Sequence, residues 1–190
     1  MTRRLFQTVL YVALALGANP GFAGALTPAE LSGLRDGDMR KLVVHSEPKP
    51  VPAVILLDMD GGEQTLASLA GQYVLLNFWA TWCAPCRKEM PSLDALEVAF
   101  GGADFVVRPV AAGRNPVPAI EKFWRSAELT ALQSWRDPKM TLAGQMGVFG
   151  LPATILLDPE GREIARMTGD ANWFSEEAVA LVSALLGRAE

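Results

Sequence analysis

The sequence predicts an α/β fold in which helices flank a mixed central sheet, and three observations lead to this prediction. The apolar run Tyr73–Trp79 has the length and the bulky side chains of a strand that is buried on both faces. A helical repeat of apolar residues separates it from a second apolar run, Phe105–Ala112, as expected for a βαβ unit with parallel strands. Near the C-terminus, the segments 153–157 and 163–168 flank a strong turn signal at 158–161 and predict an antiparallel hairpin.

The elements expected before the first of these strands are short. Thr27-Pro28-Ala29-Glu30 is a capping box with proline at the first helical position, so a helix is expected over 28–34. Three prolines make 45–52 an extended lead-in, and His45 is expected in irregular chain there. The remaining expected elements are a strand over 54–57, a turn over 58–62 and a short helical turn over 65–69.

The helix of the βαβ unit is expected to begin at or just after Cys83. Apolar residues at helical spacing form one face, and charged residues fall on other positions. The apolar residues are Met90, Leu93, Leu96 and Phe100, and the charged ones are Lys88, Glu89, Asp94 and Glu97. Pro91 lies inside this helix and is expected to bend it.

Two further helices are predicted later in the chain. One starts at Asn115 or Pro116 and carries an apolar stripe that includes Ile120 and Trp124. The other is capped by Ser175 and ends at Gly187.

The first 25 residues have the layout of an export signal. Two arginines precede an apolar stretch, and small residues follow it, with possible cleavage sites ending at Ala23 and at Ala25. The apolar stretch is shorter than the about 20 residues that a membrane-spanning helix needs, which favours a cleaved signal peptide over a membrane anchor. With either outcome, the folded part of the chain is expected outside the cytoplasm.

The charge balance excludes one class of partner. The segment 1–25 contains two arginines and no acid, so the other 15 basic and 21 acidic residues leave a net charge of −6. Nucleic acid is not expected as a partner, because phosphate binding needs clustered positive charge.

The chain has two cysteines, and their spacing points to redox chemistry. A disulfide between Cys83 and Cys86 closes too short a loop to stabilise the fold much. A zinc site needs four ligands, and the chain offers two thiols and one histidine, His45. Transient copper(I) binding by Cys83 and Cys86 stays open, whereas no resident metal or cofactor is expected. Reversible oxidation of the pair is the favoured interpretation.

The position of the pair predicts a role for each sulfur. The start of a helix presents unpaired N–H groups and a partial positive charge, which favour the thiolate form of Cys83. Cys86 follows one turn later and is expected to be more shielded. We therefore expect Cys83 to be the attacking nucleophile and Cys86 the resolving thiol that breaks the mixed disulfide.

Two motifs resemble a known family. The stretch from Asn77 to Pro91, which contains Trp82-Cys83-Ala84-Pro85-Cys86, and the later Gly150-Leu151-Pro152-Ala153-Thr154 resemble the thioredoxin superfamily, and more closely its TlpA/ResA/CcmG-type branch. The stretch 172–178 is most similar to TlpA proteins. The resemblance implies a thioredoxin-like domain over 52–190, preceded by an N-terminal extension over 26–51 that holds the short helix.

The resemblance also implies roles for individual residues. Pro152 would follow a cis peptide bond and pack against the cysteine pair, and the exposed backbone beside it would pair with a client segment. Leu151 would help to select clients, and Trp82, Ala84 and Pro85 would contact them. Glu89 matches an acid that tunes cysteine acidity in ResA-like proteins, although a solvated helix carboxylate is an equally open interpretation. Asn77 stands where ordinary thioredoxins have a buried aspartate.

The function implied by this resemblance is that of a periplasmic thiol–disulfide oxidoreductase. It would take electrons from a membrane thiol donor and reduce disulfides in apo-cytochrome c or in copper-delivery proteins, in support of respiratory oxidase assembly. A monomer is expected, soluble in the periplasm or anchored to the inner membrane. The alternatives are an oxidant of the DsbA kind, which would have a higher reduction potential, and a copper(I) chaperone that uses the same thiols.

Overall fold

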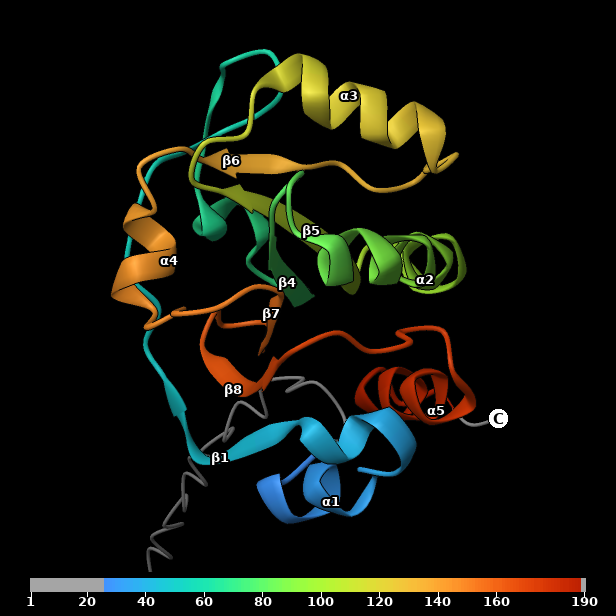
Figure 1. The fold of residues 1–190 in the computed structure, drawn as a ribbon. Coiled ribbons are helices and arrows are strands. Elements are labelled where there is room, and N and C mark those ends of the chain that lie inside the picture. Colours follow the sequence, from blue (N-terminus) through green and yellow to red (C-terminus); the bar gives the residue numbers. More distant parts are fainter. Residues whose placement is uncertain (1–25, 189–190) are drawn as a thin grey trace, which may run out of the picture.

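The computed structural model of this protein describes residues 26–188, so the expected export signal at 1–25 lies outside the described residues. Eight strands form one sheet in the order β1-β8-β7-β4-β5-β6-β2-β3 (Figure 1). The strands are β1 (Val43–Lys49), β2 (Leu56–Leu57), β3 (Glu63–Gln64), β4 (Tyr73–Trp79), β5 (Phe105–Ala112), β6 (Trp135–Asp137), β7 (Ala153–Leu157) and β8 (Glu163–Thr168). The helices are α1 (Pro28–Gly33), η1 (Gly37–Lys41), η2 (Leu66–Leu69), α2 (Ala84–Phe100), α3 (Val117–Ser126), α4 (Thr141–Gln145) and α5 (Glu176–Leu185).

The sheet is mixed, as predicted. Strands β4 and β5 are parallel and are joined through α2, which confirms the βαβ unit. Strand β7 pairs antiparallel with both β4 and β8, which confirms the C-terminal hairpin. Because β4 lies between β5 and β7, every residue of β4 is buried, and the chain leaves this strand directly into the cysteine motif.

Two apolar cores lie on opposite faces of the sheet. On one face, α2, α3 and α5 cover the sheet with residues such as Leu93, Ile120 and Leu181. On the other face, α4 contributes Leu142, which packs with Leu76 of β4. Figure 1 shows this arrangement, with α2 and α5 on one side of the strands and α4 on the other. Adjacent residues of β4 therefore point into different cores, as the period of two in a strand requires.

Several short elements were not predicted from the sequence. They are η1, β3, β6 and α4. Each is five residues or shorter, so none is long enough to show a clear repeat of apolar residues. The capping box at Thr27 and Glu30 is confirmed, and it starts α1 as expected.

The expectation that His45 lies in irregular chain is wrong. His45 belongs to β1, which pairs antiparallel with β8, and its Nε2 lies 2.6 Å from Glu163 Oε1. Arg166 donates two hydrogen bonds to the same carboxylate, from Nε to Oε1 at 2.5 Å and from Nη2 to Oε2 at 2.7 Å. Burial would raise the pKa of Glu163, but the bonds from Arg166 and His45 outweigh it and lower that pKa. Glu163, the partner of His45, lies on β8, 118 residues later in the chain. The prolines near His45 give no sign of this pairing.

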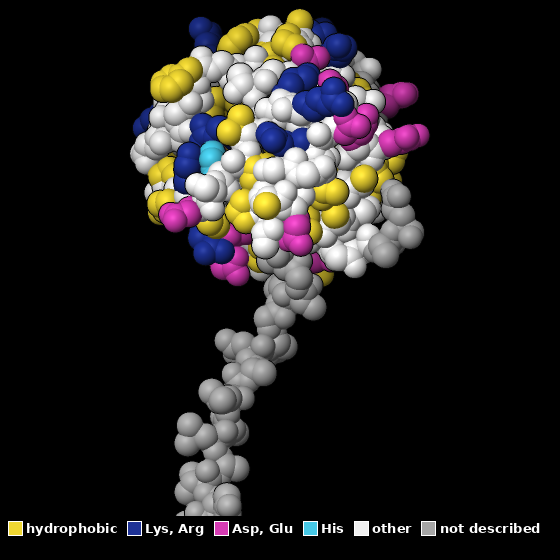
Figure 2. Space-filling model, turned by 90° about the horizontal axis from the view of Figure 1, so that it is seen from below, with side chains coloured by type: hydrophobic (Ala, Val, Ile, Leu, Met, Phe, Trp, Pro, Cys, Tyr) yellow, Lys and Arg dark blue, Asp and Glu magenta, His cyan; other side chains and the backbone are white. Residues whose placement is uncertain are grey.

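The face that contains β1 and α1 carries charges of both signs. Figure 2 shows Lys and Arg side chains interspersed with Asp, Glu and hydrophobic side chains over this face. Among residues 26–188, no helix has the length and apolar character needed to span a bilayer.

Candidate functional site

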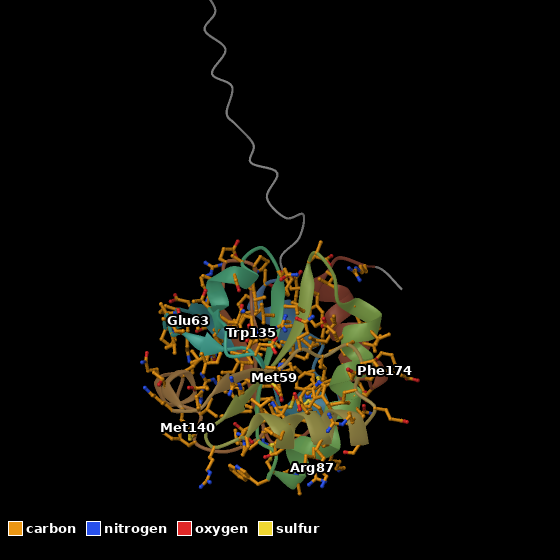
Figure 3. The ribbon with its side chains drawn as sticks, turned by 90° about the horizontal axis from the view of Figure 1, so that it is seen from above. Met59, Glu63, Arg87, Trp135, Met140 and Phe174 are labelled. Carbon is orange, nitrogen blue, oxygen red and sulfur yellow. A yellow bond between two sulfur atoms is a disulfide. The ribbon has the colours of Figure 1, made fainter. Side chains whose placement is uncertain are left out.

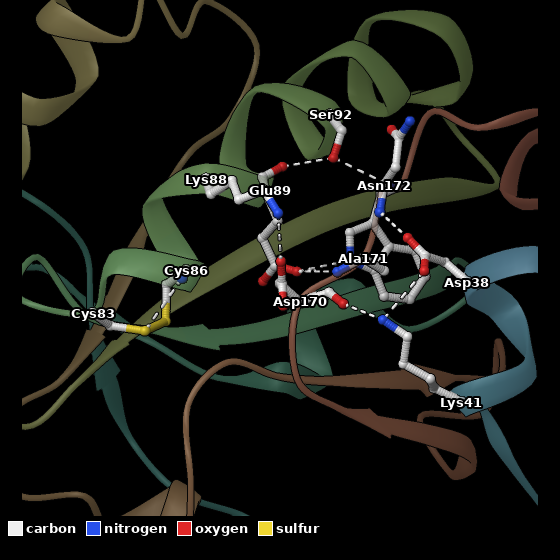
Figure 4. Close-up of polar contacts among 11 residues, drawn as sticks. Asp38, Lys41, Cys83, Cys86, Lys88, Glu89, Ser92, Asp170, Ala171 and Asn172 are labelled. Atoms are coloured by element: carbon white, nitrogen blue, oxygen red, sulfur yellow. Dashed lines mark hydrogen bonds and ion pairs between the residues drawn. A yellow bond between two sulfur atoms is a disulfide. The ribbon is translucent and has the colours of Figure 1, made fainter.

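The candidate site lies where β4 ends and α2 begins. Cys83 and Cys86 are joined by a disulfide, which Figure 4 shows at the first turn of α2. Cys83 is the N-cap residue of that helix, and its Sγ accepts a hydrogen bond from the Cys86 N–H at 3.3 Å. Pro85 occupies the first turn, where its missing N–H leaves no bond unmade. The helix start therefore holds Cys83 next to unpaired backbone donors, an arrangement that stabilises a negative sulfur.

The two sulfurs differ in their access to solvent. Cys83 is 6% exposed, whereas Cys86 is 0% exposed. The residues around Cys83 are open: Trp82 is 68% exposed, and Ala84 and Pro85 are exposed as well. Cys83 is therefore the more accessible of the two sulfurs.

A second loop contains Leu151 and Pro152, which the sequence predicts to lie beside the cysteine pair. The Leu151-Pro152 peptide bond is cis, in agreement with the expectation. Leu151 is half-buried and packs against both apolar cores, one of which contains Cys83 and Cys86. The Pro152 carbonyl accepts a hydrogen bond from Gly169 at 2.9 Å, which fixes this loop to the end of β8. Two residues before Leu151, Phe149 is 98% exposed, and sequence reasoning did not single it out.

Glu89 lies one turn after Cys86 on α2 and is buried, with 3% of its surface exposed. The open question about this residue is thus settled against a solvated carboxylate. Its Oε1 accepts from the Asn77 amide at 2.9 Å, and its Oε2 accepts from the Ala171 N–H at 3.1 Å and from the Trp173 indole at 3.3 Å. Burial raises the pKa of Glu89 to about 7, although these three bonds oppose the shift.

A polar hollow connects Glu89 with the surface. Its walls carry two ion pairs, Lys88 with Asp170 at 3.3 Å and Lys41 with Asp38 at 3.3 Å. Figure 4 shows Glu89 between the disulfide on one side and Asp38 and Lys41 on the other. A proton that leaves Glu89 therefore has a polar route out that does not pass the disulfide.

The partners of Glu89 come from two separate parts of the chain. Asn77 lies on β4, and its amide also donates to Thr154 on β7 at 2.9 Å. Ala171 and Trp173 lie in the loop between β8 and α5. Asn77 could be identified from the sequence, but Thr154, which bonds Asn77, and Ala171 and Trp173, which bond Glu89, could not. Contacts across 77 to 84 residues leave no local signal.

The described residues offer no built metal site around the pair. Among residues 26–188, no group of three or more His, Cys, Asp and Glu side chains is placed to hold a metal ion. After reduction of the disulfide, Cys83 and Cys86 would provide two thiolate ligands.

Comparisons with known proteins agree with this geometry. The family model described as AhpC/TSA family matches residues 48–165. The thiol-disulfide oxidoreductase ResA of Geobacillus thermodenitrificans is 34% identical over 118 residues, which cover 62% of this chain and 67% of ResA. ResA of Bacillus subtilis is 32% identical over 124 residues, 65% of this chain and 68% of that protein.

A solved structure extends the similarity to three dimensions. The thiol:disulfide interchange protein DsbE from Chlorobium tepidum superposes with a TM-score of 0.64 at 27% identity, over 74% of this chain and 98% of that one. The matched family model spans the central strands, the cysteine motif and the cis-proline loop. The chain therefore belongs to the AhpC/TSA family and has a thioredoxin-like fold.

Proposed function

We propose that this protein is a periplasmic thiol–disulfide oxidoreductase that reduces disulfides in apo-cytochrome c or in copper-delivery proteins during respiratory oxidase assembly. The observation that carries the proposal is the Cys83–Cys86 disulfide at the start of α2, with one sulfur near the surface and the other buried. Similarity to ResA and DsbE supports the class of reaction. The family resemblance and the export signal expected at 1–25 support the client and the compartment.

The reaction begins with the reduced pair. The Cys83 thiolate attacks one sulfur of a client disulfide, so that a Cys83–client S–S bond forms and the client's own S–S bond breaks. The departing client sulfur leaves as a thiolate and takes up a proton. Because Cys83 caps α2, the N–H of Cys86 and the helix dipole stabilise the attacking thiolate.

The second step needs Cys86 as a thiolate inside the protein. Cys86 attacks Cys83 Sγ, the intramolecular disulfide forms again, and the second client thiolate is released. Two electrons have then moved from the protein to the client. Glu89 is suited to accept the Cys86 proton, because its pKa of about 7 lets the carboxyl gain or lose a proton near neutral pH. The hollow beside Lys88 and Asp170 lets that proton reach solvent.

Client recognition uses the exposed side chains around Cys83. In this proposal an extended client segment pairs with the backbone of the cis-proline loop. Trp82, Leu151 and Phe149 supply apolar contacts to such a segment. Ala84 and Pro85, both exposed beside Cys83, contact the same client segment in this proposal.

The cycle requires an outside source of electrons. An oxidising compartment closes the pair, so a membrane thiol donor must reduce Cys83–Cys86 after each turnover. A monomer suffices, because both sulfurs and Glu89 belong to one chain.

The test uses the full chain with Cys83→Ser or Cys86→Ser and a disulfide-closed peptide that carries the haem-attachment sequence Cys-x-x-Cys-His. We expect Cys86→Ser to accumulate a stable mixed disulfide with the peptide, which mass spectrometry detects, and Cys83→Ser to form none. Trapping by Cys83→Ser instead would reverse the assigned roles. Oxidised insulin serves as a client of unrelated sequence, and a rate for insulin equal to that for the peptide would contradict the proposed client.

A redox titration of the wild-type protein against glutathione or dithiothreitol tests the direction. A potential toward about −270 mV supports a reductant, whereas one near about −120 mV would make the protein an oxidant. Stoichiometric copper(I) binding without reduction of either substrate would support the chaperone alternative and overturn the proposal.

A further inference from the structure

A groove on the β6 side of the sheet is separate from the cysteine site, and its wall contains Arg108, which has no ion-pair partner among residues 26–188. The groove has a volume of about 810 Å³, within the range of small-molecule pockets. The turn after β2, helix η2, helix α3 and the segment before β6 form its walls. Figure 3 views the molecule from the side of α3 and labels Met59 and Trp135, two residues that line it.

Arg108 is 8% exposed, and this remaining surface faces the groove. Its Nη1 donates to the Gln133 carbonyl at 2.8 Å and to Gln133 Oε1 at 3.4 Å, and its guanidinium carbon lies 4.8 Å from the centre of the Trp135 ring. Its Nε is buried and has no hydrogen-bond partner. Within residues 26–188, Nη2 makes no hydrogen bond either, and no carboxylate lies within ion-pair distance of Arg108.

Arg166 provides a comparison, because the Nε–Nη2 edge of its guanidinium is paired with a carboxylate. Its Nε and Nη2 bind the two oxygens of Glu163 side by side. Among residues 26–188 the same edge of Arg108 has no carboxylate partner, and because its Nε is enclosed, Nη2 is the atom of that edge that a ligand would reach. The charge of Glu97 acts on Arg108. The carboxylate of Glu97 nevertheless accepts a hydrogen bond from the Val107 N–H, and Val107 belongs to the apolar core that α2 covers. Burial lowers the pKa of Arg108, and the charge of Glu97 opposes this only in part.

A buried cation without a counter-charge is costly, and an anionic ligand would remove that cost. Aromatic walls stand beside the charge: Trp135 stacks on the guanidinium, and Trp124 of α3 lines the same groove. Three acidic side chains, Asp58, Asp60 and Glu121, line the groove together with Arg125, so the lining other than Arg108 carries more acid than base. These charges favour a ligand with one carboxylate at its inner end and an uncharged outer end.

We propose that this groove binds a small organic monocarboxylate with a flat apolar body, whose carboxylate pairs with Arg108 while its body lies against Trp135 and Trp124. This site is independent of the Cys83–Cys86 chemistry, because it shares no residue with it.

The test titrates the full-length protein with benzoate at constant ionic strength and follows the indole N–H signals by NMR. We expect saturable shifts at Trp124 and Trp135 and none at Trp82, which lies beside the disulfide. Benzyl alcohol has the same shape without the charge, and terephthalate adds a second charge at the outer end. We expect both to bind at least tenfold more weakly than benzoate. Benzyl alcohol lacks the charge-assisted bond to Arg108, and the second carboxylate of terephthalate is repelled by the acidic side chains of the groove.

Two variants test the role of Arg108. Arg108→Met should weaken benzoate at least tenfold, whereas Arg114→Met, which removes an exposed arginine outside the groove, should leave the affinity unchanged. If Arg108→Met does not fold, Arg108→Lys keeps the charge but loses the planar fork, and a several-fold loss is expected. Equal binding of benzoate and benzyl alcohol by the wild-type protein, or unchanged affinity in Arg108→Met, would overturn the proposal. Peptide reduction by the dithiol should persist in Arg108→Met, so the two proposals fail separately.

Discussion

The side-chain amide of Asn77 donates to Glu89 Oε1 at 2.9 Å and so ties the central strand to the helix that carries the disulfide. Both side chains are buried, at 0% and 3% exposed. The other donors to this carboxyl, the Ala171 N–H and the Trp173 indole, are neutral as well. Burial of this carboxyl favours its protonated form, and the three hydrogen bonds that it accepts oppose that preference only in part.

Glu89→Gln should remove a pH dependence of stability. Burial raises the pKa of Glu89 in the folded protein to about 7, from 4.5. Between these two values the folded state holds a proton that the unfolded state has released, so the free energy of unfolding falls as pH rises, by up to about 3 kcal/mol. Urea unfolding of the oxidised protein at several pH values measures this fall. We expect it to flatten in Glu89→Gln and to persist in Glu47→Gln, which changes an exposed carboxylate. An unchanged fall in Glu89→Gln would contradict the assignment.

Asn77→Asp should destabilise the protein in a pH-dependent way. The new carboxyl would lie at hydrogen-bond distance from Glu89, and two buried carboxylates cannot both ionise without a large cost. We expect a loss of a few kcal/mol near pH 8 and a much smaller loss near pH 5, where the pair shares a proton. Thermal melting of the variant and the wild type at both pH values provides the measurement. Equal losses at the two values would argue against direct coupling.

Asp94→Asn should weaken the attachment of the segment that leads into β6. Asp94 is 8% exposed, and its carboxylate accepts the backbone N–H groups of Thr130, Ala131 and Leu132 at 2.9 to 3.1 Å. Loss of the charge and of one acceptor oxygen should lower the free energy of unfolding by about 2 to 3 kcal/mol. Urea denaturation gives the value. Asp104→Asn removes a surface ion pair with Arg188 and should change stability by less than about 1 kcal/mol.

Phe149→Ser should affect client binding without affecting the fold. Phe149 is 98% exposed and lies close in sequence to the cis-proline loop, so its removal leaves no cavity. If it contacts clients, KM for the peptide disulfide should rise several-fold, while kcat and the melting temperature stay close to the wild-type values. Val98→Ser, at an equally apolar exposed position on α2, serves as the control. A KM that does not change would exclude Phe149 from client recognition.

The sequence was sufficient to predict the elements that carry their own local pattern. The strand Tyr73–Trp79, the helix after Cys83, the second strand of the βαβ unit and the C-terminal hairpin are all confirmed. Their apolar repeats and turn signals lie within a few residues of one another, and the same elements bring the cysteine pair to the start of a helix.

The burial of polar residues on α2 could not be predicted in the same way. Helical spacing places Glu89 and Asp94 away from the apolar stripe, yet both are buried. The loop from Ala171 to Trp173 covers Glu89, and the segment from Thr130 to Leu132 covers Asp94. These segments lie 36 to 84 residues further along the chain, so periodicity within the helix gives no sign of them.

Strand β1 has a practical consequence for the choice of fragments. It pairs with β8 at the edge of the sheet, and Glu163 on that strand is bound by His45. A fragment that starts at residue 52 would leave β8 with a row of open N–H and C=O groups, and Glu163 would lose His45 and keep Arg166 as its partner. Such an edge recruits strands from other molecules. We therefore expect a fragment that starts at residue 52 to aggregate under conditions in which the longer chain stays in solution.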